Sequence, residues 1–534
     1  MGASSPPYAA GLPVATPGRM RRNPLLGGRR GAQPVAPPSD DARAAYAQVP
    51  YPGLAFPQSH PDRLATNARL MGMKPQAPER CRVLELGCGD GGNLIPMAAA
   101  LEGSEFVGLD LEPSAIARAT ERAAALGAGN ATFAVEDLAT LDSEALGRFD
   151  YVIAHGVYSW VPRPVAERLL AVCRAVLEKQ GVAYVSYNAL PGGHLRALVW
   201  DAMRFHGREH AEPGDRLGAA REMLAVLAEG IPGDDPYQRF SAVYAERLGK
   251  RSDAVLYHDD LEPLNRPILF TDFLAEVEPH GLQYLAEADW FEMTPTRLPP
   301  AAAELLERSG QDRVAREQYL DFLKCRAYRQ TLLCRDEVKL DAAPSVENVR
   351  ALMAAAPVRP SSKRVDASDR SRVEFRTAKG ATMTTDHPLL KAGLLVLGEA
   401  WPRRLSFEDV VAQAAELSGA APDAAGERAL ADLWLRGYDA NLIRLHSYAP
   451  PIAAVPGGRP RSSEVARRLL ALGDETVTSL DHESVGLDER MRRLVELADG
   501  SRDREALARE LGDVKRSRLD ENLQVLAALA LLEA

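Results

Sequence analysis

The fold of this chain is decided at residues 83–93, which read VLELGCGDGGN. The first four residues predict an apolar strand, and the glycines that follow let the backbone turn sharply and approach a ligand without a Cβ in the way. These glycines are Gly87, Gly89, Gly91 and Gly92. Residues 93–102 then predict a helix whose N-terminus faces the turn. A strand, a glycine turn and a helix in this order are typical of a nucleotide-cofactor site in an α/β fold.

Strands and helices alternate beyond this turn. We expect strands at 82–86, 105–110, 132–136, 149–154 and 182–187, and helices at 93–102, 114–126 and 164–178. Alternation with short connections predicts a Rossmann-like doubly wound α/β core, in which a parallel sheet is covered by helices on both faces. Residues 282–287 predict one further strand that returns to the same sheet.

Three acids accompany the predicted strands and indicate the cofactor. Glu85 and Asp110 end the first two strands and Asp137 follows the third, so parallel pairing gathers their carboxylates at one edge of the sheet. Three anions repel a pyrophosphate, but they suit S-adenosyl-L-methionine, which carries an ammonium, a sulfonium and ribose hydroxyls. Asp110 follows the glycine turn by about 20 residues, the spacing at which an acid reaches ribose hydroxyls.

The other predicted cofactor-binding residues lie next to these acids or in the turn: Cys88, Asn93, Leu111 and Leu138. We interpret Cys88 as a small filler against the cofactor, because no basic side chain near it in sequence lowers its pKa. Two alternatives remain open. Gly87, Gly89 and Gly92 also satisfy the dinucleotide fingerprint, although an NAD or FAD site shares Asp110 and not Glu85, and a glycine turn can simply pack a helix on a strand.

Methyl-transfer chemistry is expected at the ends of the fourth and fifth strands. In-line displacement at a sulfonium carbon needs a lone pair held close and aligned, and an amine acceptor must first lose a proton. His155 and Tyr158 are candidates to accept that proton. Tyr187 and Tyr158 can form an aromatic wall against a cation, and Asn188 can fix the acceptor by hydrogen bonds. His155 also serves as a candidate to line the cofactor pocket.

Several longer runs resemble a known family. They lie at 51–66, 84–97, 155–162 (HGVYSWVP), 187–192 (YNALPG), 281–288 and 316–323. In these runs the chain resembles the class I S-adenosylmethionine-dependent methyltransferases, and more narrowly the bacterial subgroup with a methyltransferase regulatory domain. The resemblance covers nearly everything after residue 45 and is weakest in the C-terminal third. This group is similar to bacterial outer-membrane-protein lysine methyltransferases, which implies a protein lysine as one candidate acceptor.

A segment before the first strand is a candidate lid. Tyr51 and Phe56 would exclude water from the cofactor, and Arg63 would bind the methionine carboxylate bidentately. The resemblance favours this lid over the alternative of an ordinary amphipathic helix.

Composition limits the partners. The chain has 534 residues, a net charge of −10 and no apolar run long enough to span a bilayer, so nucleic acid and membrane are not expected partners. Five cysteines without a C-x-x-C pair are typical of a cytoplasmic protein, and no metal-binding spacing is present. A homodimer is compatible with these features. The first residues are rich in Pro and Arg and lack an apolar signal region.

Domain limits follow from changes in pattern. We expect a disordered tail over 1–44, a methyltransferase core over 45–210, a helical regulatory domain over 211–340 and a linker over 341–388. A winged-helix-like unit is expected at 389–455 and a helical or winged-helix-like unit at 456–534, where helices recur and few basic residues face a nucleic acid. We expect methyl transfer to a protein or small-molecule acceptor. The alternative from another class is a non-catalytic sensor of the cofactor.

Overall fold

The computed structural model describes residues 53–230, 235–295, 298–310 and 312–534, all within one contact unit. Tyr51, predicted to cover the cofactor, lies outside the described residues, as does the predicted tail over 1–44.

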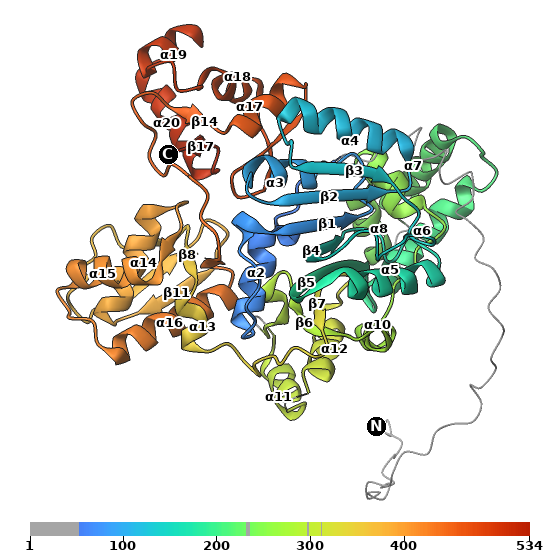
Figure 1. The fold of residues 1–534 in the computed structure, drawn as a ribbon, viewed down its shortest axis with the longest axis horizontal. Helices are drawn as coiled ribbons and strands as arrows, with labels where there is room; N and C mark the ends of the chain where they lie inside the picture. The colour runs from blue at the N-terminus through green and yellow to red at the C-terminus, as the bar shows by residue number, and fades with distance from the viewer. Residues whose placement is uncertain (1–52, 231–234, 296–297, 311) are drawn as a thin grey trace, which may run out of the picture. The chain divides into compact units, whose positions relative to one another are not determined.

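A mixed sheet of seven strands organises the chain (Figure 1). The strands are β1 (Arg82–Leu86), β2 (Glu105–Asp110), β3 (Ala131–Val135), β4 (Phe149–Ala154), β5 (Leu177–Asn188), β6 (Leu282–Glu287) and β7 (Tyr328–Arg335). Their order is β3-β2-β1-β4-β5-β7-β6, with β1 to β5 parallel and β7 antiparallel to both neighbours. The strand order reverses between β1 and β4, and doubly wound folds bind ligands at the carboxyl ends of such strands.

Helices cover both faces of this sheet. The apolar sides of α2 (Pro61–Leu70), α3 (Leu94–Ala100) and α4 (Pro113–Leu126) share one buried cluster with one face. Helices α5 (Arg163–Val176) and α10 (Phe270–Val277) share a second cluster with the other face. Helix α4 begins at Pro113, whose fixed φ suits the first helical position, so the connection from β2 stays short.

Strand β7 is the main difference from the sequence prediction. The late strand at 282–287 is confirmed as β6, but the helical domain predicted over 211–340 misses β7, which separates β6 from β5. The consecutive residues Leu332, Leu333 and Cys334 are all buried. A strand covered on both faces loses the alternation of polar and apolar residues that reveals a half-buried strand. The sheet is therefore mixed and not purely parallel.

A helical unit is inserted between β5 and β6. Helices α6 (Gly192–Gly207), α7 (Pro213–Glu229) and α8 (Pro236–Gly249) pack around a separate buried cluster that includes Trp200 and Leu248. The chain then passes through α9 (Asp253–Leu256) and a π-helix, η4 (Tyr257–Leu261), before α10. Helices α11 (Pro300–Arg308) and α12 (Arg313–Lys324) connect β6 to β7.

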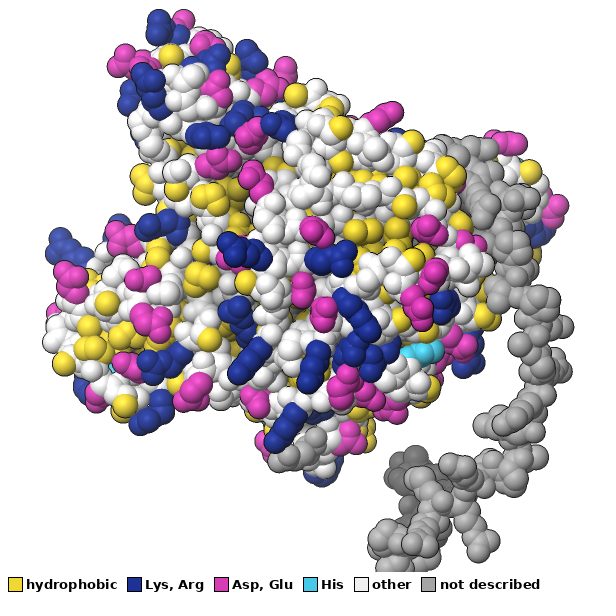
Figure 2. Space-filling view, in the orientation of Figure 1, with side chains coloured by type: hydrophobic (Ala, Val, Ile, Leu, Met, Phe, Trp, Pro, Cys, Tyr) yellow, Lys and Arg dark blue, Asp and Glu magenta, His cyan; other side chains and the backbone are white. Residues whose placement is uncertain are grey.

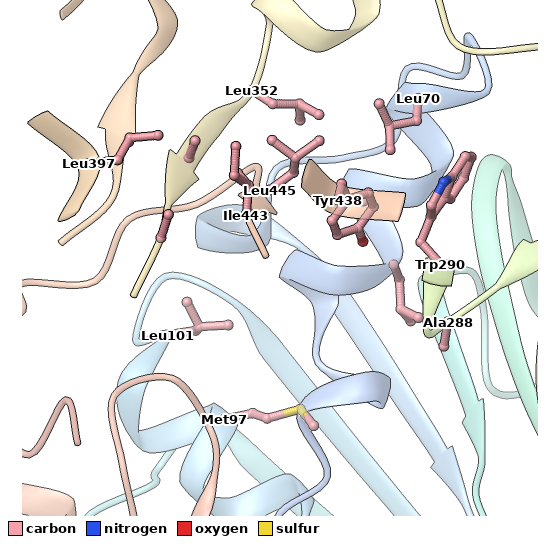
Figure 3. Packing of buried hydrophobic residues seen from close by; sticks show 14 of the residues in the cluster. Leu70, Met97, Leu101, Ala288, Trp290, Leu352, Leu397, Tyr438, Ile443 and Leu445 are labelled. Carbon is pink, nitrogen blue, oxygen red and sulfur yellow. The ribbon is translucent and has the colours of Figure 1, made fainter. Parts of the chain in front are cut away.

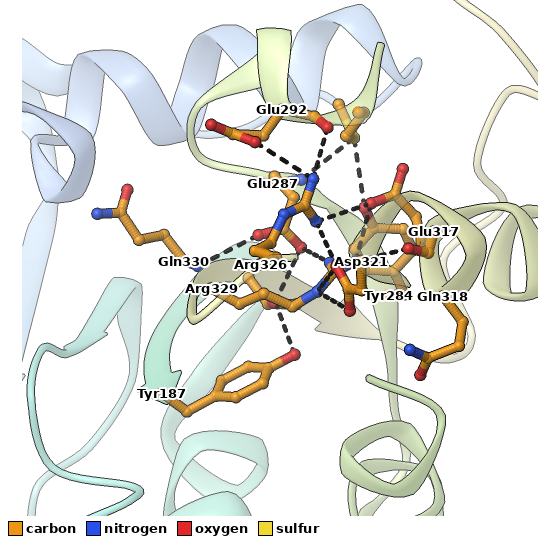
Figure 4. Close-up of polar contacts among 12 residues, drawn as sticks. Tyr187, Tyr284, Glu287, Glu292, Glu317, Gln318, Asp321, Arg326, Arg329 and Gln330 are labelled. Atoms are coloured by element: carbon orange, nitrogen blue, oxygen red, sulfur yellow. Dashed lines mark hydrogen bonds and ion pairs between the residues drawn. The ribbon is translucent and has the colours of Figure 1, made fainter. Parts of the chain in front are cut away.

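Two buried arginines join α12 to the sheet (Figure 4). Arg329, in β7, is 1% exposed; its guanidinium contacts Glu287 at 2.5 Å and Asp321 at 2.9 Å. Arg326 contacts Asp321 at 2.9 Å and Glu317 at 3.5 Å. Removing one partner would leave a buried charge uncompensated, so this cluster rigidly fixes the late strands that extend the cofactor-binding sheet.

The C-terminal part contains two further helical units. The first has α13 (Val346–Arg350), α14 (Pro388–Ala400), α15 (Phe407–Ser418) and α16 (Ala424–Asp439), with strands β8 (Met353–Ala355), β12 (Leu405–Ser406) and β13 (Arg444–His446). In this unit the helices α14 to α16 are followed by the strand β13. A hairpin of β10 (Val373–Arg376) and β11 (Thr382–Thr385) pairs with β9 (Arg359–Pro360), within the segment 341–388 that the sequence predicts as a linker.

The second unit has α17 (Glu464–Ala471), α18 (Glu489–Leu497), α19 (Arg504–Glu510) and α20 (Arg516–Ala528). Its strands are β14 (Arg461–Ser462), β15 (Thr476–Thr478), β16 (Ser484–Gly486) and β17 (Leu532–Glu533). Strands β15 and β16 form a hairpin, whose turn lies at residues 479–483. None of the described helices is long and apolar enough to cross a membrane.

The C-terminal part shares its core with the methyltransferase sheet. Figure 3 shows Leu70 of α2, Trp290 after β6, Tyr438 of α16 and Leu445 of β13 in one packed cluster. Trp290 stacks on Tyr438 with ring centroids 5.9 Å apart. Separating these parts would expose apolar surface from both of them.

Candidate cofactor and acceptor site

The glycine turn lies where the strand order reverses. The N–H groups of Gly87 and Cys88 donate to the carbonyl of Leu109, at 2.7 and 3.1 Å, which ties the turn to the end of β2. Gly89 has a φ of +56°, and no described heavy atom lies within 4 Å of where its Cβ would stand. The turn therefore presents open space at Gly89, as a cradle for a ligand requires.

Residues 53–60, here called the covering segment, pass directly over this turn. A Cβ on Gly92 would lie 2.4 Å from the Cα of Gly53, so the two backbones approach more closely than any side chain allows. Further along this segment, the Phe56 ring stacks on His155, with centroids 3.9 Å apart. Phe56 thus covers the end of β4, and its role as a lid over the cofactor stays a prediction.

Glu85 is the buried acid of the site. Its Oε1 accepts a hydrogen bond from Asn93 Nδ2 at 2.8 Å, whereas its buried Oε2 has no hydrogen-bond partner among the described residues. Burial, together with the nearby carboxylates of Asp110 and Asp90, raises the pKa of Glu85 to about 8, although the hydrogen bond from Asn93 lowers it. An unpaired carboxylate oxygen in this position fits a ligand that brings a cationic or hydrogen-bond-donating group.

Asp110 is fixed by backbone hydrogen bonds. Its Oδ2 accepts from Gly89 N–H at 2.8 Å and its Oδ1 from Glu112 N–H at 2.9 Å. Burial raises its pKa although these two N–H groups lower it. Each oxygen keeps a lone pair, so the carboxylate is oriented beside the glycine turn and remains able to accept from hydroxyl donors.

Asn93 connects the acid to the covering segment. Its Nδ2 donates to Glu85 and, at 3.0 Å, to Ser59 Oγ. Its Oδ1 accepts from the N–H of Phe56 at 3.0 Å. A single buried side chain therefore holds both the acid and the segment that covers the turn.

His155 lies at the carboxyl end of β4. Its Nδ1 is 2.9 Å from the hydroxyl of Tyr184, and burial lowers its pKa to about 4. The imidazole is therefore neutral at pH 7 and keeps one nitrogen lone pair for a hydrogen bond. Gly156, the next residue, donates its N–H to Ser186 Oγ at 2.8 Å, which fixes this end of β4 against β5.

Tyr158 and Tyr187 lie in the buried cluster on the opposite face from Tyr184. The hydroxyl of Tyr158 makes a short hydrogen bond to Glu276, and its ring meets Phe273 edge-on at 5.1 Å. Tyr187 stacks on Phe273 at 4.1 Å and its hydroxyl lies 3.2 Å from Thr331 Oγ1. The structure does not bring these two hydroxyls together with His155, and their role in transfer stays a prediction.

The other predicted residues are placed as follows. Asn188 donates to Asn265 Oδ1 at 2.8 Å, and Arg63 donates to the Tyr438 hydroxyl at 3.3 Å, with Asp289 at 4.0 Å. Asp137 follows β3 and accepts from the N–H of Ala139. Buried Cys88 has a raised pKa because of burial, as a filler would. Leu111 and Leu138 follow β2 and β3 and are partly buried. Cofactor contacts for these residues stay predictions.

Sequence reasoning missed two residues that contact the site. Tyr184 lies inside the predicted fifth strand, and alternation along that strand places it on the His155 side, which was an available signal. His482 lies 3.0 Å from Asn93 Oδ1, across 389 residues of sequence, and no local pattern indicates that contact.

Comparison with known proteins agrees with this geometry. Three family models match the chain: a methyltransferase domain at 83–181, a predicted methyltransferase regulatory domain at 252–335 and the PKMT C-terminal winged helix domain at 458–523. A similar relative is the protein RP789 of Rickettsia prowazekii, which is 31% identical, with 89% of this chain and 87% of the relative covered.

A solved structure has the same fold. PKMT2 from Rickettsia typhi, also solved in complex with AdoHcy, is 24% identical with a TM-score of 0.81, covering 90% of this chain and 100% of that chain. The site residues fit the same cofactor, since Glu85 keeps an unpaired oxygen and the turn is open at Gly89. This chain belongs to the S-adenosylmethionine-dependent methyltransferases that carry a methyltransferase regulatory domain, and it is an enzyme that uses S-adenosyl-L-methionine.

Proposed function

We propose that this enzyme methylates lysine side chains of a protein. The observation that carries the proposal is the likeness to PKMT2, a protein lysine methyltransferase, over 90% of the chain. That likeness includes the C-terminal region at 458–523, which matches a winged-helix domain described for such enzymes. A methyltransferase core alone serves many acceptors, so the additional domains are the features that favour a macromolecular acceptor.

The cofactor-binding residues have distinct roles in this proposal. Asp110 would bind ribose hydroxyls, and the free oxygen of Glu85 would accept from the ammonium of the cofactor. Phe56 and Asn93 hold the covering segment and exclude water, which strengthens these polar contacts. When bound, S-adenosyl-L-methionine supplies an activated methyl group on a sulfonium.

His155 and Tyr184 would prepare the acceptor amine. A lysine ammonium has an ordinary pKa near 10.4 and must lose a proton before its nitrogen has a lone pair to donate. Neutral His155 can accept that proton at its other ring nitrogen, Nε2. The Tyr184 hydroxyl holds the ring in place through Nδ1 at 2.9 Å. A desolvated pocket lowers the pKa of the amine and reduces the work required.

The surface charge supports a protein acceptor over a nucleic acid. On the face drawn in Figure 2, acidic and basic side chains are interspersed. The net charge of the chain is −10. A nucleic-acid acceptor would be repelled by this net charge, since phosphate binding depends on a basic surface.

The experiment uses S-adenosylmethionine with a labelled methyl group, incubated with the full-length enzyme and a lysate of the source organism. Protein, nucleic acid and small-molecule fractions are counted separately, and the labelled protein is hydrolysed to identify the methylated amino acid. We expect label in protein, recovered as methyl-lysine. An Asp110→Ala enzyme is the control for background transfer. Label confined to small molecules would instead support the metabolite alternative.

A cytoplasmic location and a homodimer are further parts of the proposal. All five cysteines are free, and four of them, Cys81, Cys88, Cys173 and Cys334, are buried. Free thiols favour a reducing compartment. Sedimentation of the purified protein tests the dimer, and fractionation of cells tests the location.

A further inference from the structure

The hairpin turn between β15 and β16 reaches the cofactor site. His482 in this turn lies with its Nε2 3.0 Å from Asn93 Oδ1, and Ser484 Oγ accepts from the N–H of Ala55 at 3.0 Å. We propose that His482 and Ser484 are positioning residues through which the C-terminal winged-helix domain holds the covering segment over the glycine turn. Cofactor affinity then depends on this domain.

The contacts form a continuous path to the acid of the site. Asn93 Oδ1 accepts from the N–H of Phe56 in the covering segment and from the Nε2–H of His482, both at 3.0 Å, and from Ser59 Oγ at 3.4 Å. Its Nδ2 donates to Glu85 Oε1, and the other oxygen of Glu85 is the unpaired one. Because an amide oxygen only accepts, His482 must carry its proton on Nε2 and act as the donor. Loss of that donor frees the Asn93 amide to turn away from Glu85.

Ser484 grips the covering segment at a second point. Its hydroxyl accepts from Ala55 N–H and also lies 3.3 Å from the carbonyl oxygen of Ala55, to which it can donate. Ala55 directly precedes Phe56, whose ring stacks on His155. One hairpin therefore makes two contacts around Phe56. Ser484 holds the backbone of the preceding residue, and His482 holds the Asn93 side chain that accepts the hydrogen bond from the Phe56 N–H.

The backbone of His482 supports a positioning role. It has a φ of +59°, in the left-handed region that few residues other than glycine adopt, and its side chain is 4% exposed. Such a conformation persists only where its surroundings hold it, and it recurs at functional sites. Here it directs the imidazole out of its own domain and into the cofactor site.

Ion pairs hold the domain that carries this hairpin against α2 and α4. Arg122 of α4 makes two hydrogen bonds to the Asp474 carboxylate, at 3.0 and 2.7 Å, just before β15. Arg404 contacts both Asp62 of α2, at 3.0 Å, and Asp481, at 2.8 Å, next to His482. Bonds on both sides of the hairpin restrict its movement, so it can act as a fixed support and not as a loose tether.

The test measures binding of S-adenosylhomocysteine to full-length variants by calorimetry, which requires no acceptor. It therefore rests on the cofactor site and not on the lysine proposal. His482→Ala and His482→Gln form a matched pair. Both place a residue other than glycine in the left-handed backbone conformation, but only glutamine keeps an N–H donor of similar reach. We expect the dissociation constant to rise roughly three- to tenfold for alanine, the range that one net hydrogen bond supports, and to recover for glutamine.

Two more measurements separate positioning from general stability. Ser484→Ala removes only the hydrogen bonds to Ala55 and should also weaken binding. Arg493→Ala breaks an exposed ion pair on α18 of the same domain and should leave binding unchanged. Amide hydrogen exchange over residues 53–60 should quicken in His482→Ala and Ser484→Ala and stay unchanged in Arg493→Ala. If His482→Ala does not fold, the affinity of Ser484→Ala tests the proposal alone. Unchanged affinity in the hairpin variants, or equal losses for alanine and glutamine at position 482, would overturn the proposal.

Discussion

The carboxylate of Asp62, near the start of α2, lies 2.7 Å from Nδ1 of His446 in β13. Its other oxygen accepts from the N–H groups of Ser447 and Tyr448, and Arg404 completes the surroundings. The helix that follows the covering segment is thus anchored in the C-terminal part. This anchor changes what removal of that part should do.

A chain that ends at Leu340 should not bind the cofactor normally. The domain limits predicted from the sequence would leave the cofactor-binding core intact in such a chain. The structure adds that truncation exposes the apolar cluster around Leu70 and leaves Asp62 without its partners. We expect little soluble protein and at least tenfold weaker S-adenosylhomocysteine binding, measured by calorimetry. The control is a chain without residues 1–37, a deletion that leaves every described residue in place. Normal binding by the truncated chain would refute the shared-core argument.

Cofactor binding should release a proton through Glu85. The pKa of Glu85 is raised to about 8, so in the free enzyme this carboxyl is mostly protonated at pH 7. A ligand ammonium beside it favours the carboxylate and lowers its pKa. Affinity for S-adenosylhomocysteine should therefore rise as pH increases from 6.5 towards 8. Calorimetry in buffers of different ionisation enthalpy measures the released proton.

The contribution of Glu85 to folding stability changes with pH in the opposite direction to the cofactor affinity. Since the pKa of Glu85 in the folded state lies above its unfolded value near 4.5, this group contributes stability below pH 4.5 and loses it as pH rises through about 8. Glu85→Gln is isosteric and cannot titrate. It should abolish the proton release and flatten this part of the pH dependence of unfolding. Proton release that persists in Glu85→Gln would assign the titration to another group.

Tyr184→Phe and Tyr158→Phe should have different effects. Tyr184 holds His155, so loss of its hydroxyl should lower kcat about ten- to a hundredfold with little change in cofactor affinity. Tyr158 bonds to Glu276 in the opposite cluster, and loss of its hydroxyl should cost about 1 kcal/mol of stability and leave kcat nearly unchanged. Steady-state kinetics and urea unfolding measure both. The sequence-based role for Tyr158 predicts the reverse order of kcat values.

Gly89→Val should block the cradle. A branched side chain at a φ of +56° costs about 1–3 kcal/mol, and it would fill the open space at the turn. We expect binding of S-adenosylhomocysteine to weaken more than tenfold, with an intact fold by circular dichroism. Gly129→Ala provides a control, because its site is also open but has no left-handed φ and lies away from the turn. Unchanged affinity in Gly89→Val would place the cofactor elsewhere.

The placement of the glycine turn and its acids at strand ends could be predicted from the sequence because the signals are local. Strand ends, glycines and acids within residues 83–137 determine where Glu85, Gly89 and Asp110 lie, and the predicted strands at 82–86, 105–110 and 149–154 coincide with β1, β2 and β4. The contact between Asn93 and His482 depends on packing between segments 389 residues apart. No periodicity encodes such a contact, and β7 was hidden because burial on both faces removes alternation.

The distance in sequence between Asn93 and His482 also has a consequence in time. Synthesis proceeds from the N-terminus at roughly 5–20 residues per second, so the hairpin leaves the ribosome roughly 20 to 80 seconds after the glycine turn. Strands β2 to β7 leave the ribosome during that interval, and the covering segment lacks the support of the hairpin until the interval ends. A nascent chain would acquire its full affinity for S-adenosylmethionine only when nearly all of it has been made.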